Sequence, residues 1–544
     1  MKNFLHGINE LKKLCSLSLF FVLFTCLSAL SLPSFTQEVP VHISNTSIYS
    51  FLEEMAEEQL IRISTVTKPW SRLYIAGKLD ELQKVREELN PRQLKELDFY
   101  LRDYNKELLP GKNYQKRPDL FYYKDSLFTF SVNPIGGIRY WSNGNGTVHH
   151  RWNGAEAFAY IGKWGFYASL RDNHESQPIS GKTYITQRMG GNYKGDNDYS
   201  EMRGGITYDW KWGTLGLVKD HFIWGNNVHG ANIFSGRTPS FAHLDLFLNP
   251  VPWFEFHFTE GWLVSEVVDS SRSYWVSGSY GVDYREVYFP KHLSANLFTF
   301  KPWQHTSFSF GNSIVFADVG LNPGYLIPFF FFKSVDHTLN AHIDNQNSQM
   351  FFDFSTRVIR HTHFYATFFL DEIATTRMFD PDRHSNFFSY KAGAEVSNFP
   401  LQNAGIQAEF TRTNPLAFRH YVPTLTFASN RYNLGNYLLD NSREYYLALW
   451  FRPVRGLLIR TDYNLAQKGP DYTALGTDRL GLPFMETVEW ENREAGIFVR
   501  YQIINDGFIF AGFRYRKVSG PPEYTPEIFR GKTSTFSGGI NFGF

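Results

Sequence analysis

One segment near the middle of the chain carries a distinctive set of polar and aromatic side chains. Lys219 and Asp220 are followed by Trp224-Gly225, and Ser235 lies further along. On a strand that leads into an external loop, these residue types are typical of an ion pair inside a barrel and an aromatic side chain at the membrane interface. A contact with a ligand is the alternative interpretation.

A second set of residues has the chemistry needed to bind sugars. Aromatic faces stack on the C–H groups of pyranose rings, and carboxylates or amides accept hydrogen bonds from sugar hydroxyls. Aromatic residues of external loops are therefore candidates for contacts with sugars, the alternative being that they are interfacial aromatics. The candidates are Trp141, Tyr184, Tyr193, Tyr274, Trp275 and Tyr472.

Catalytic and metal sites find little support in the sequence. His361 and His363 lie two residues apart, but a short solvated turn is expected there, without a third metal ligand nearby. Residues 196–198 (Asp-Asn-Asp) offer oxygens for calcium, yet their spacing is not that of an EF-hand. A Gly-x-Ser-x-Gly nucleophile elbow is absent. We therefore predict no enzyme activity, no bound metal and no cofactor, and a hydrolase on the barrel rim ranks last among the functions.

The elements that must position these residues are strands, and the C-terminal one shows the pattern most clearly. Over residues 534–544, aromatic and aliphatic residues alternate with Ser, Gly and Asn, up to the terminal Phe544. Because successive side chains on a strand point to opposite faces, one face suits lipid and the other a polar lumen. Closing this last strand on the first removes an edge that would otherwise aggregate. The terminal aromatic also resembles the signal recognised by the bacterial barrel-assembly machinery.

The alternation continues from residue 126 onwards, and the connections alternate in length. Outer-membrane barrels have short periplasmic turns and long external loops, so this scheme predicts about eighteen antiparallel strands. The pattern in residues 264–290 is ambiguous and could add or remove one hairpin. The short turns are expected near 162–164, 210–212, 250–252, 301–305, 360–363, 400–403, 453–456 and 505–507, and the long loops over 172–200, 318–348, 372–386, 413–442, 466–488 and 517–533.

Composition supports a barrel. Aromatic residues make up 18% of the 544 residues although the mean hydropathy is only −0.33, which suits lipid-facing bands and interfacial girdles. After the N-terminus no run of apolar residues is long enough for a spanning helix. The net charge of +1 and the absence of a basic stripe exclude nucleic acid as the main partner.

The N-terminal part differs from the barrel pattern. Residues 1–36 have the lysines, apolar run and small residues of a secretory signal, with cleavage expected between residues 31 and 37. Both cysteines, Cys15 and Cys26, lie in this segment. Residues 37–118 are expected to form a periplasmic bundle of three short helices and a linker, with caps at Ser71 and at Asn90-Pro91. The barrel then occupies residues 119–544.

Several short motifs together resemble the capsule-assembly Wzi family of outer-membrane proteins, over nearly all of the mature chain. Residues 409–415, Leu434-Gly435 and residues 441–444 are most similar to its gliding-motility RemB branch. The chain departs from the family pattern at Asn226-Asn227, where a second glycine is expected. The matching motifs are residues 48–52, residues 68–72, Lys219-Asp220, Trp224-Gly225, Ser235, Leu321-Asn322-Pro323, Asp344-Asn345 and Leu370-Asp371-Glu372.

The resemblance implies an outer-membrane barrel with a periplasmic helical bundle and extracellular loops, acting as a surface lectin that anchors or assembles capsular polysaccharide. The expected partners are surface polysaccharide, outer-membrane lipid and, during biogenesis, the barrel-assembly machinery. Two alternatives remain: a component of a gliding-motility or secretion apparatus with protein partners, and a diffusion porin.

Overall fold

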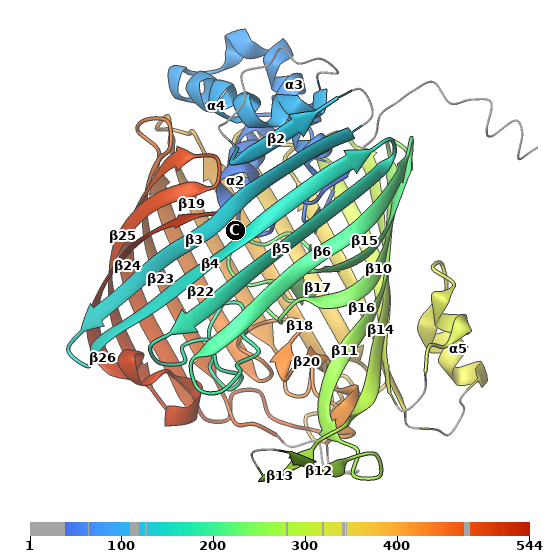
Figure 1. Cartoon of the computed structure of the whole chain (residues 1–544). Coiled ribbons are helices and arrows are strands. Elements are labelled where there is room, and N and C mark those ends of the chain that lie inside the picture. Colours follow the sequence, from blue (N-terminus) through green and yellow to red (C-terminus); the bar gives the residue numbers. More distant parts are fainter. Residues whose placement is uncertain are drawn as a thin grey trace, which may run out of the picture. The chain divides into compact units, whose positions relative to one another are not determined.

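Within the residues that the structure describes, eighteen antiparallel strands form a closed barrel (Figure 1). The computed structural model describes residues 38–63, 65–108, 119–125, 128–278, 281–317, 320–339, 343, 345–472 and 479–543. The predicted signal peptide, Asp344 and Phe544 lie outside them. The predicted fold class and strand number are confirmed.

The barrel strands follow the order of the chain around the ring. In that order they are β3 (Phe128–Asn143), β4 (Gly146–Ile161), β5 (Trp164–Glu175), β6 (Asp198–Trp210), β7 (Gly213–Asp220), β10 (Phe241–Val251), β11 (Phe254–Val268), β14 (Tyr288–Trp303), β15 (Thr306–Ala317), β16 (Gln346–Thr356), β17 (Thr362–Glu372), β18 (Phe387–Ser397), β19 (Ala404–Thr413), β22 (Ser442–Phe451), β23 (Leu457–Lys468), β24 (Trp490–Ile504), β25 (Gly507–Ser519) and β26 (Gly531–Phe542). A further short strand, β2 (Phe121–Lys124), pairs with the start of β3.

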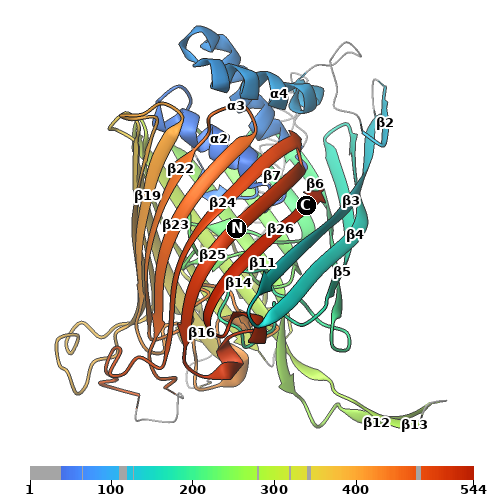
Figure 2. The same ribbon diagram turned by 90° about the vertical axis from the view of Figure 1, so that its left-hand side faces the viewer.

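The last strand closes the ring on the first, as the C-terminal pattern predicts. Strand β26 pairs with β3 from Phe536 opposite Ser142 to Phe542 opposite Gly136 (Figure 2). Phe536, Ile540 and Phe542 are exposed on one face of β26. Closing the ladder gives β26 and β3 a partner over this stretch, so their backbone groups there are satisfied without water.

The predicted turns and loops also match the structure. Each predicted short turn joins two consecutive strands, and all of these turns lie at one end of the barrel. The region 264–290 contains an extra hairpin, β12 (Tyr274–Gly278) and β13 (Gly281–Arg285), which pairs with itself and not with the barrel. Among the described residues, no helix is both long and apolar enough to cross a membrane.

Three helices precede the barrel where the sequence predicts them: α2 (Thr46–Glu57), α3 (Arg72–Lys84) and α4 (Pro91–Leu108). Ser71 caps α3 by accepting a hydrogen bond from Tyr74 N at 3.0 Å. Before α4, Gln93 Oε1 accepts from Asn90 N at 2.8 Å while Asn90 Oδ1 accepts from Gln93 N at 3.0 Å, which is a reciprocal cap. The apolar faces of the three helices pack into one core of their own.

These helices contact the end of the barrel that carries the short turns. Gln59 Nε2 donates to the carbonyl of Arg357 at 2.8 Å, and Asn505 Nδ2 donates to Asp103 at 2.5 Å. Glu54 lies at the centre of this contact, since its carboxylate accepts from Asn398 at 2.6 Å and pairs with Arg92 and Arg452. Burial raises the pKa of Glu54, but the two arginines outweigh it and set the pKa at about 2.

Part of the inside of the barrel is filled by a segment of the chain itself. We call residues 221–240, which connect β7 to β10, the inserted segment. Its short strand β8 (Ile223–Trp224) pairs on one side with β9 (Phe234–Ser235) and on the other with β1 (Thr67–Lys68), in a small sheet separate from the barrel wall. An apolar core joins this sheet to inward-facing residues of the wall such as Phe351 and Phe369. The sequence does not predict this packing, because residues 221–240 look like an external loop.

The described part of the connection between β15 and β16 lies against the outer face of the wall. Asn296 on β14 stands between two residues that join the lumenal core, so its own side chain faces outward. Its amide donates to the carbonyl of Pro328 at 2.9 Å, and Phe332 N donates to Asn312 Oδ1 at 2.9 Å. Residues 320–339, which include helix α5 (Phe332–Leu339), thus cover polar side chains that would otherwise face lipid.

Replacing Glu54 with alanine is expected to loosen the helices from the turns. The buried guanidinium of Arg92 and the partly buried one of Arg452 would lose their shared carboxylate, and breaking a buried pair in this way costs about 3 to 5 kcal/mol. Hydrogen exchange of the α2 amides should speed up accordingly, and in the unmodified protein the same protection should be lost as the pH falls below 4.5 toward 2.

The matched control is Glu81→Ala, because Glu81 pairs with Lys78 on the surface of α3. That change should leave α2 exchange unaltered. Unchanged α2 protection in Glu54→Ala would show that the helices are held by other contacts.

Candidate functional site

The motif residues at the end of β7 do not pair with each other. Asp220 is buried and accepts hydrogen bonds from Arg203 Nη1 at 3.0 Å and from the Tyr167 hydroxyl at 2.9 Å. Lys219, its neighbour on the opposite face of the strand, donates to the carbonyl of Met202 at 2.6 Å. The expected ion pair between Lys219 and Asp220 is therefore wrong, because Asp220 pairs with Arg203 instead.

Trp224 is not an interfacial aromatic, and that prediction is wrong. Its side chain is 3% exposed and packs edge-on against Phe234, with the ring centroids 5.1 Å apart. Gly225 has a φ of +93°, a conformation that favours glycine, and its N–H donates to the carbonyl of Val66 at 3.0 Å. Ser235 donates to the carbonyl of Leu434 at 3.0 Å. These motif residues therefore belong to the inserted segment and do not face lipid, because apolar residues inside the barrel pack against that segment.

Two inward-facing carboxylates fasten the inserted segment to the wall. Asp353 accepts from Asn226 N at 2.8 Å and from Asn226 Nδ2 at 2.7 Å. Glu409 accepts from the backbone N–H groups of Val228 at 2.7 Å and His229 at 2.8 Å. The asparagine that departs from the family pattern thus supplies a side-chain contact that glycine could not make.

A cavity of about 430 Å³ remains between the inserted loops and one side of the wall. Its wall residues lie on β3 and on β22 to β25, mostly in the half of the barrel nearer the long loops. The other side is formed by residues of the β5–β6 loop, the inserted segment and the β25–β26 loop. Its volume lies in the range of small-molecule pockets, which is about 300 to 1,000 Å³. The side chains that line it include Arg139, Trp141, Arg188, His229, Tyr446, Arg460, Asp462, Glu494, Arg514 and Arg516.

Charged groups dominate the wall side of the cavity. Arg514 Nη1 lies 2.8 Å from Asp462 Oδ2, and Arg516 Nε lies 2.6 Å from Glu494 Oε2. Arg460 makes only a longer contact with Asp462, at 3.6 Å. The sequence indicates that Arg514 and Arg516 share a face of their strand, but it does not show which distant residues join them.

The inserted segment reaches the cavity at His229. Its ring stacks on Tyr446, with the centroids 3.9 Å apart and the planes 11° from parallel. Its Nδ1 lies 3.2 Å from Glu444 Oε1. The His229 ring therefore covers one face of the Tyr446 ring. A ligand in the cavity would contact the polar imidazole of His229, which the Tyr446 ring holds in place.

The six aromatics predicted to bind polysaccharide do not form one site. Trp141 lies on β3 and not in an external loop; of the six, it alone is among the described residues that line the cavity. The Tyr193 hydroxyl donates to Glu175, and that of Tyr472 to the carbonyl of Pro483 at 3.1 Å. The remaining candidates are Tyr184, in the β5–β6 loop, and Tyr274 and Trp275, on the separate hairpin.

The predicted solvated turn at His361 and His363 is also wrong for His363. That ring is buried on β17, where its Nε2 lies 2.8 Å from the Ser355 hydroxyl. His361 remains in the turn, but its N–H donates to the carbonyl of Glu57 at 2.6 Å, so the α2 helix covers it.

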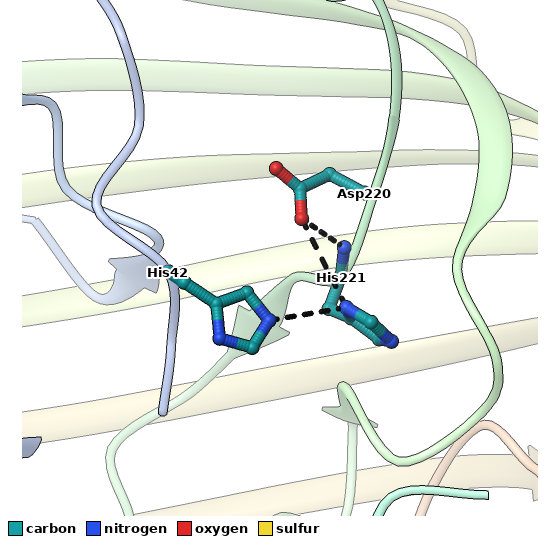
Figure 3. Close-up of side chains that lie close together, drawn as sticks. All are labelled: His42, Asp220 and His221. Atoms are coloured by element: carbon teal, nitrogen blue, oxygen red, sulfur yellow. Dashed lines mark hydrogen bonds and ion pairs between the residues drawn. The ribbon is translucent and has the colours of Figure 1, made fainter. Parts of the chain in front are cut away.

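A buried histidine pair, missed in the sequence, joins the N-terminal segment to the end of β7. Figure 3 shows His42 beside His221 and Asp220, with His42 Nε2 at 3.2 Å from His221 Nδ1. One ligand atom from each residue lies within 4.8 Å of the others, and these residue types bind zinc. However, Arg203 and Tyr167 already occupy the Asp220 carboxylate, and the charge of Arg203 opposes a divalent cation. The two histidines instead form a hydrogen-bonded contact that holds the N-terminal segment against the end of β7, and we call this contact the latch.

The comparisons with known proteins concern the fold. No sequence profile of a known family and no curated protein matches the chain. The structure of Wzi, a carbohydrate-binding β-barrel involved in group 1 capsule assembly in Escherichia coli, aligns with a TM-score of 0.56 and 11% identity over 94% of this chain and 100% of that one. OccAB2 of Acinetobacter baumannii aligns with a TM-score of 0.42 and 9% identity over 76% of this chain and 97% of that one. The likeness to Wzi shows a shared barrel architecture.

Acidification is expected to release the N-terminal segment from the latch. Burial lowers the pKa of His42, helped by Arg203, and burial also lowers that of His221. The folded state therefore favours neutral rings, so the stabilisation is complete above the ordinary pKa of 6.5 and is lost as the pH falls below it. Burial raises the pKa of Glu38 to about 8, which opposes this effect over the same range, so the measurement is made in a Glu38→Gln background. There, hydrogen exchange of amides 39–43, corrected for intrinsic rates, should rise as the pH falls from about 8 to about 5.

His42→Gln should remove this pH step, whereas His337→Gln, on the exposed face of α5, should keep it. A step of the same size in His42→Gln would contradict the latch.

Proposed function

We propose that this chain is an outer-membrane, lectin-like barrel of the Wzi type that anchors or assembles exported surface polysaccharide. The observation that carries the proposal is the cavity in the loop half of a barrel whose lumen is partly filled by the inserted segment. In this orientation the helices and short turns face the periplasm, and the long loops and the cavity face the cell exterior. The shared architecture with a carbohydrate-binding barrel supports the same function.

The packing of the inserted segment inside the lumen favours a receptor over a diffusion porin. Trp224, Phe234 and Phe351 pack together where a porin has water, and the wall carboxylates that would line a channel bind backbone amides instead. An aqueous pore requires a polar, open interior. A cavity with aromatic and charged walls suits a ligand that offers both hydroxyl groups and apolar ring faces.

A second candidate function is a structural part of a gliding or secretion apparatus. The hairpin β12–β13 pairs only with itself, and it exposes Tyr274 and Trp275, the latter by 69%. Exposed aromatics on an element outside the barrel wall are typical of protein contact sites. The polysaccharide-anchoring function and the apparatus function predict different amounts of cell-bound polysaccharide when the gene is deleted.

Deleting the gene should shift surface polysaccharide from the cells to the medium while total synthesis stays constant. The measurement is the ratio of cell-bound to released polysaccharide in the deletion strain and in the strain complemented with the intact gene. As a matched variant, the gene lacking residues 274–285 should restore retention, because that hairpin lies outside the cavity.

An unchanged cell-bound fraction in the deletion strain would contradict the proposal. A gliding or secretion defect in that strain, reproduced by loss of the hairpin alone, would support the second function instead.

A further inference from the structure

We infer, on the premise of the proposed function, that the cavity binds an anionic glycan and that Arg139 and Arg460 recognise its acidic groups. The acidic groups are carboxylates of uronate units or sulfate esters, which share the geometry that a guanidinium fork matches.

The first observation is an excess of positive charge. Five arginines line the cavity, namely Arg139, Arg188, Arg460, Arg514 and Arg516, against the two carboxylates Asp462 and Glu494. Both carboxylates are already engaged at close range by Arg514 and Arg516. Arg188 is engaged by Glu175, at 3.0 Å. The remaining positive charge therefore belongs to Arg139 and, because its contact with Asp462 is long, to Arg460.

The second observation is the setting of Arg139. Its guanidinium carbon lies 4.8 Å from the ring centroid of Trp141 and 5.3 Å from that of Phe510. Its Nε is buried and has no hydrogen-bond partner in the described part of the chain. Aromatic faces hold a cation in place but accept few of its five N–H donors. An anionic ligand would supply the missing acceptors.

The third observation is the shape and character of the space. A volume of about 430 Å³ is far larger than one carboxylate or sulfate needs, so a ligand that fills the cavity must carry its acidic group on a larger molecule. Tyr437, Tyr446 and Trp490 form part of its wall, where each side chain is largely buried. The charge and the volume together fit acidic saccharide units better than neutral sugars or small inorganic anions.

The test uses one saccharide backbone with and without its charge. Binding of oligogalacturonate to the purified full-length barrel is compared, by isothermal titration, with that of the fully methyl-esterified oligomer. A sulfated maltohexaose and unmodified maltohexaose form the second pair, which separates sulfate from carboxylate recognition. At least one acidic oligomer should bind about tenfold or more tightly than its uncharged partner, and the preference should weaken between about 0.05 M and about 0.5 M salt.

The variants assign the preference to the named side chains. Arg139→Gln and, independently, Arg460→Gln should each weaken binding of the acidic oligomer about tenfold, with little effect on the uncharged one. Arg139→Lys should restore only part of the loss, because lysine lacks the fork. Arg493→Gln is the control, since Arg493 is exposed and pairs with Glu491 outside the cavity. Circular dichroism and heat-modifiable mobility of each variant confirm that the barrel is folded.

The results separate the inference from the proposed function. Equal affinity for charged and uncharged oligomers, or an acidic preference that survives both arginine variants, would overturn the inference while glycan binding stands. Failure to bind any of these oligomers or the polysaccharide purified from the producing cells would contradict both.

Discussion

The path of the inserted segment inside this barrel depends on hydrogen bonds to the buried carboxylate of Glu409. It accepts hydrogen bonds from two consecutive backbone amides of the inserted segment, at Val228 and His229, and from Lys391 Nζ at 2.9 Å. Lys391 and Glu409 are almost completely buried, so the pair adds little net stability but fixes one arrangement strongly. Backbone amides brought into a barrel away from water must find acceptors, and this wall carboxylate supplies them.

The position of the cavity follows from that attachment. Asp353 holds Asn226 and Glu409 holds the next turn of the segment, so His229 is placed against Tyr446 on the far wall. Trp224 and Phe234 then fill the part of the lumen beneath β14 to β17. The space that remains lies against β22 to β25 and β3, where the wall carries arginines instead of phenylalanines. Packing on one side of the lumen thus leaves a charged cavity on the other.

The local parts of this structure could be predicted from the sequence, and the contacts between distant parts could not. Alternation in residues 534–544 and the spacing of turns depend on neighbouring residues, as do the caps at Ser71 and Asn90, and all agree with the structure for the residues described. The path of the inserted segment depends on Asp353 and Glu409, more than a hundred residues further along. Arg139 and Arg460 meet at one cavity only because the barrel closes. For the same reason, aromatics chosen from separate loops do not assemble into one site.

The inserted segment is proposed to close the lumen to ions, and single-channel recording of the purified barrel in a planar bilayer tests this most directly. We expect no steady open conductance from the intact protein, and open steps when Asp353→Ala and Glu409→Ala together release the inserted segment. A stable ohmic conductance of the intact protein, unchanged in the double variant, would show that water crosses the barrel and would contradict a closed lumen.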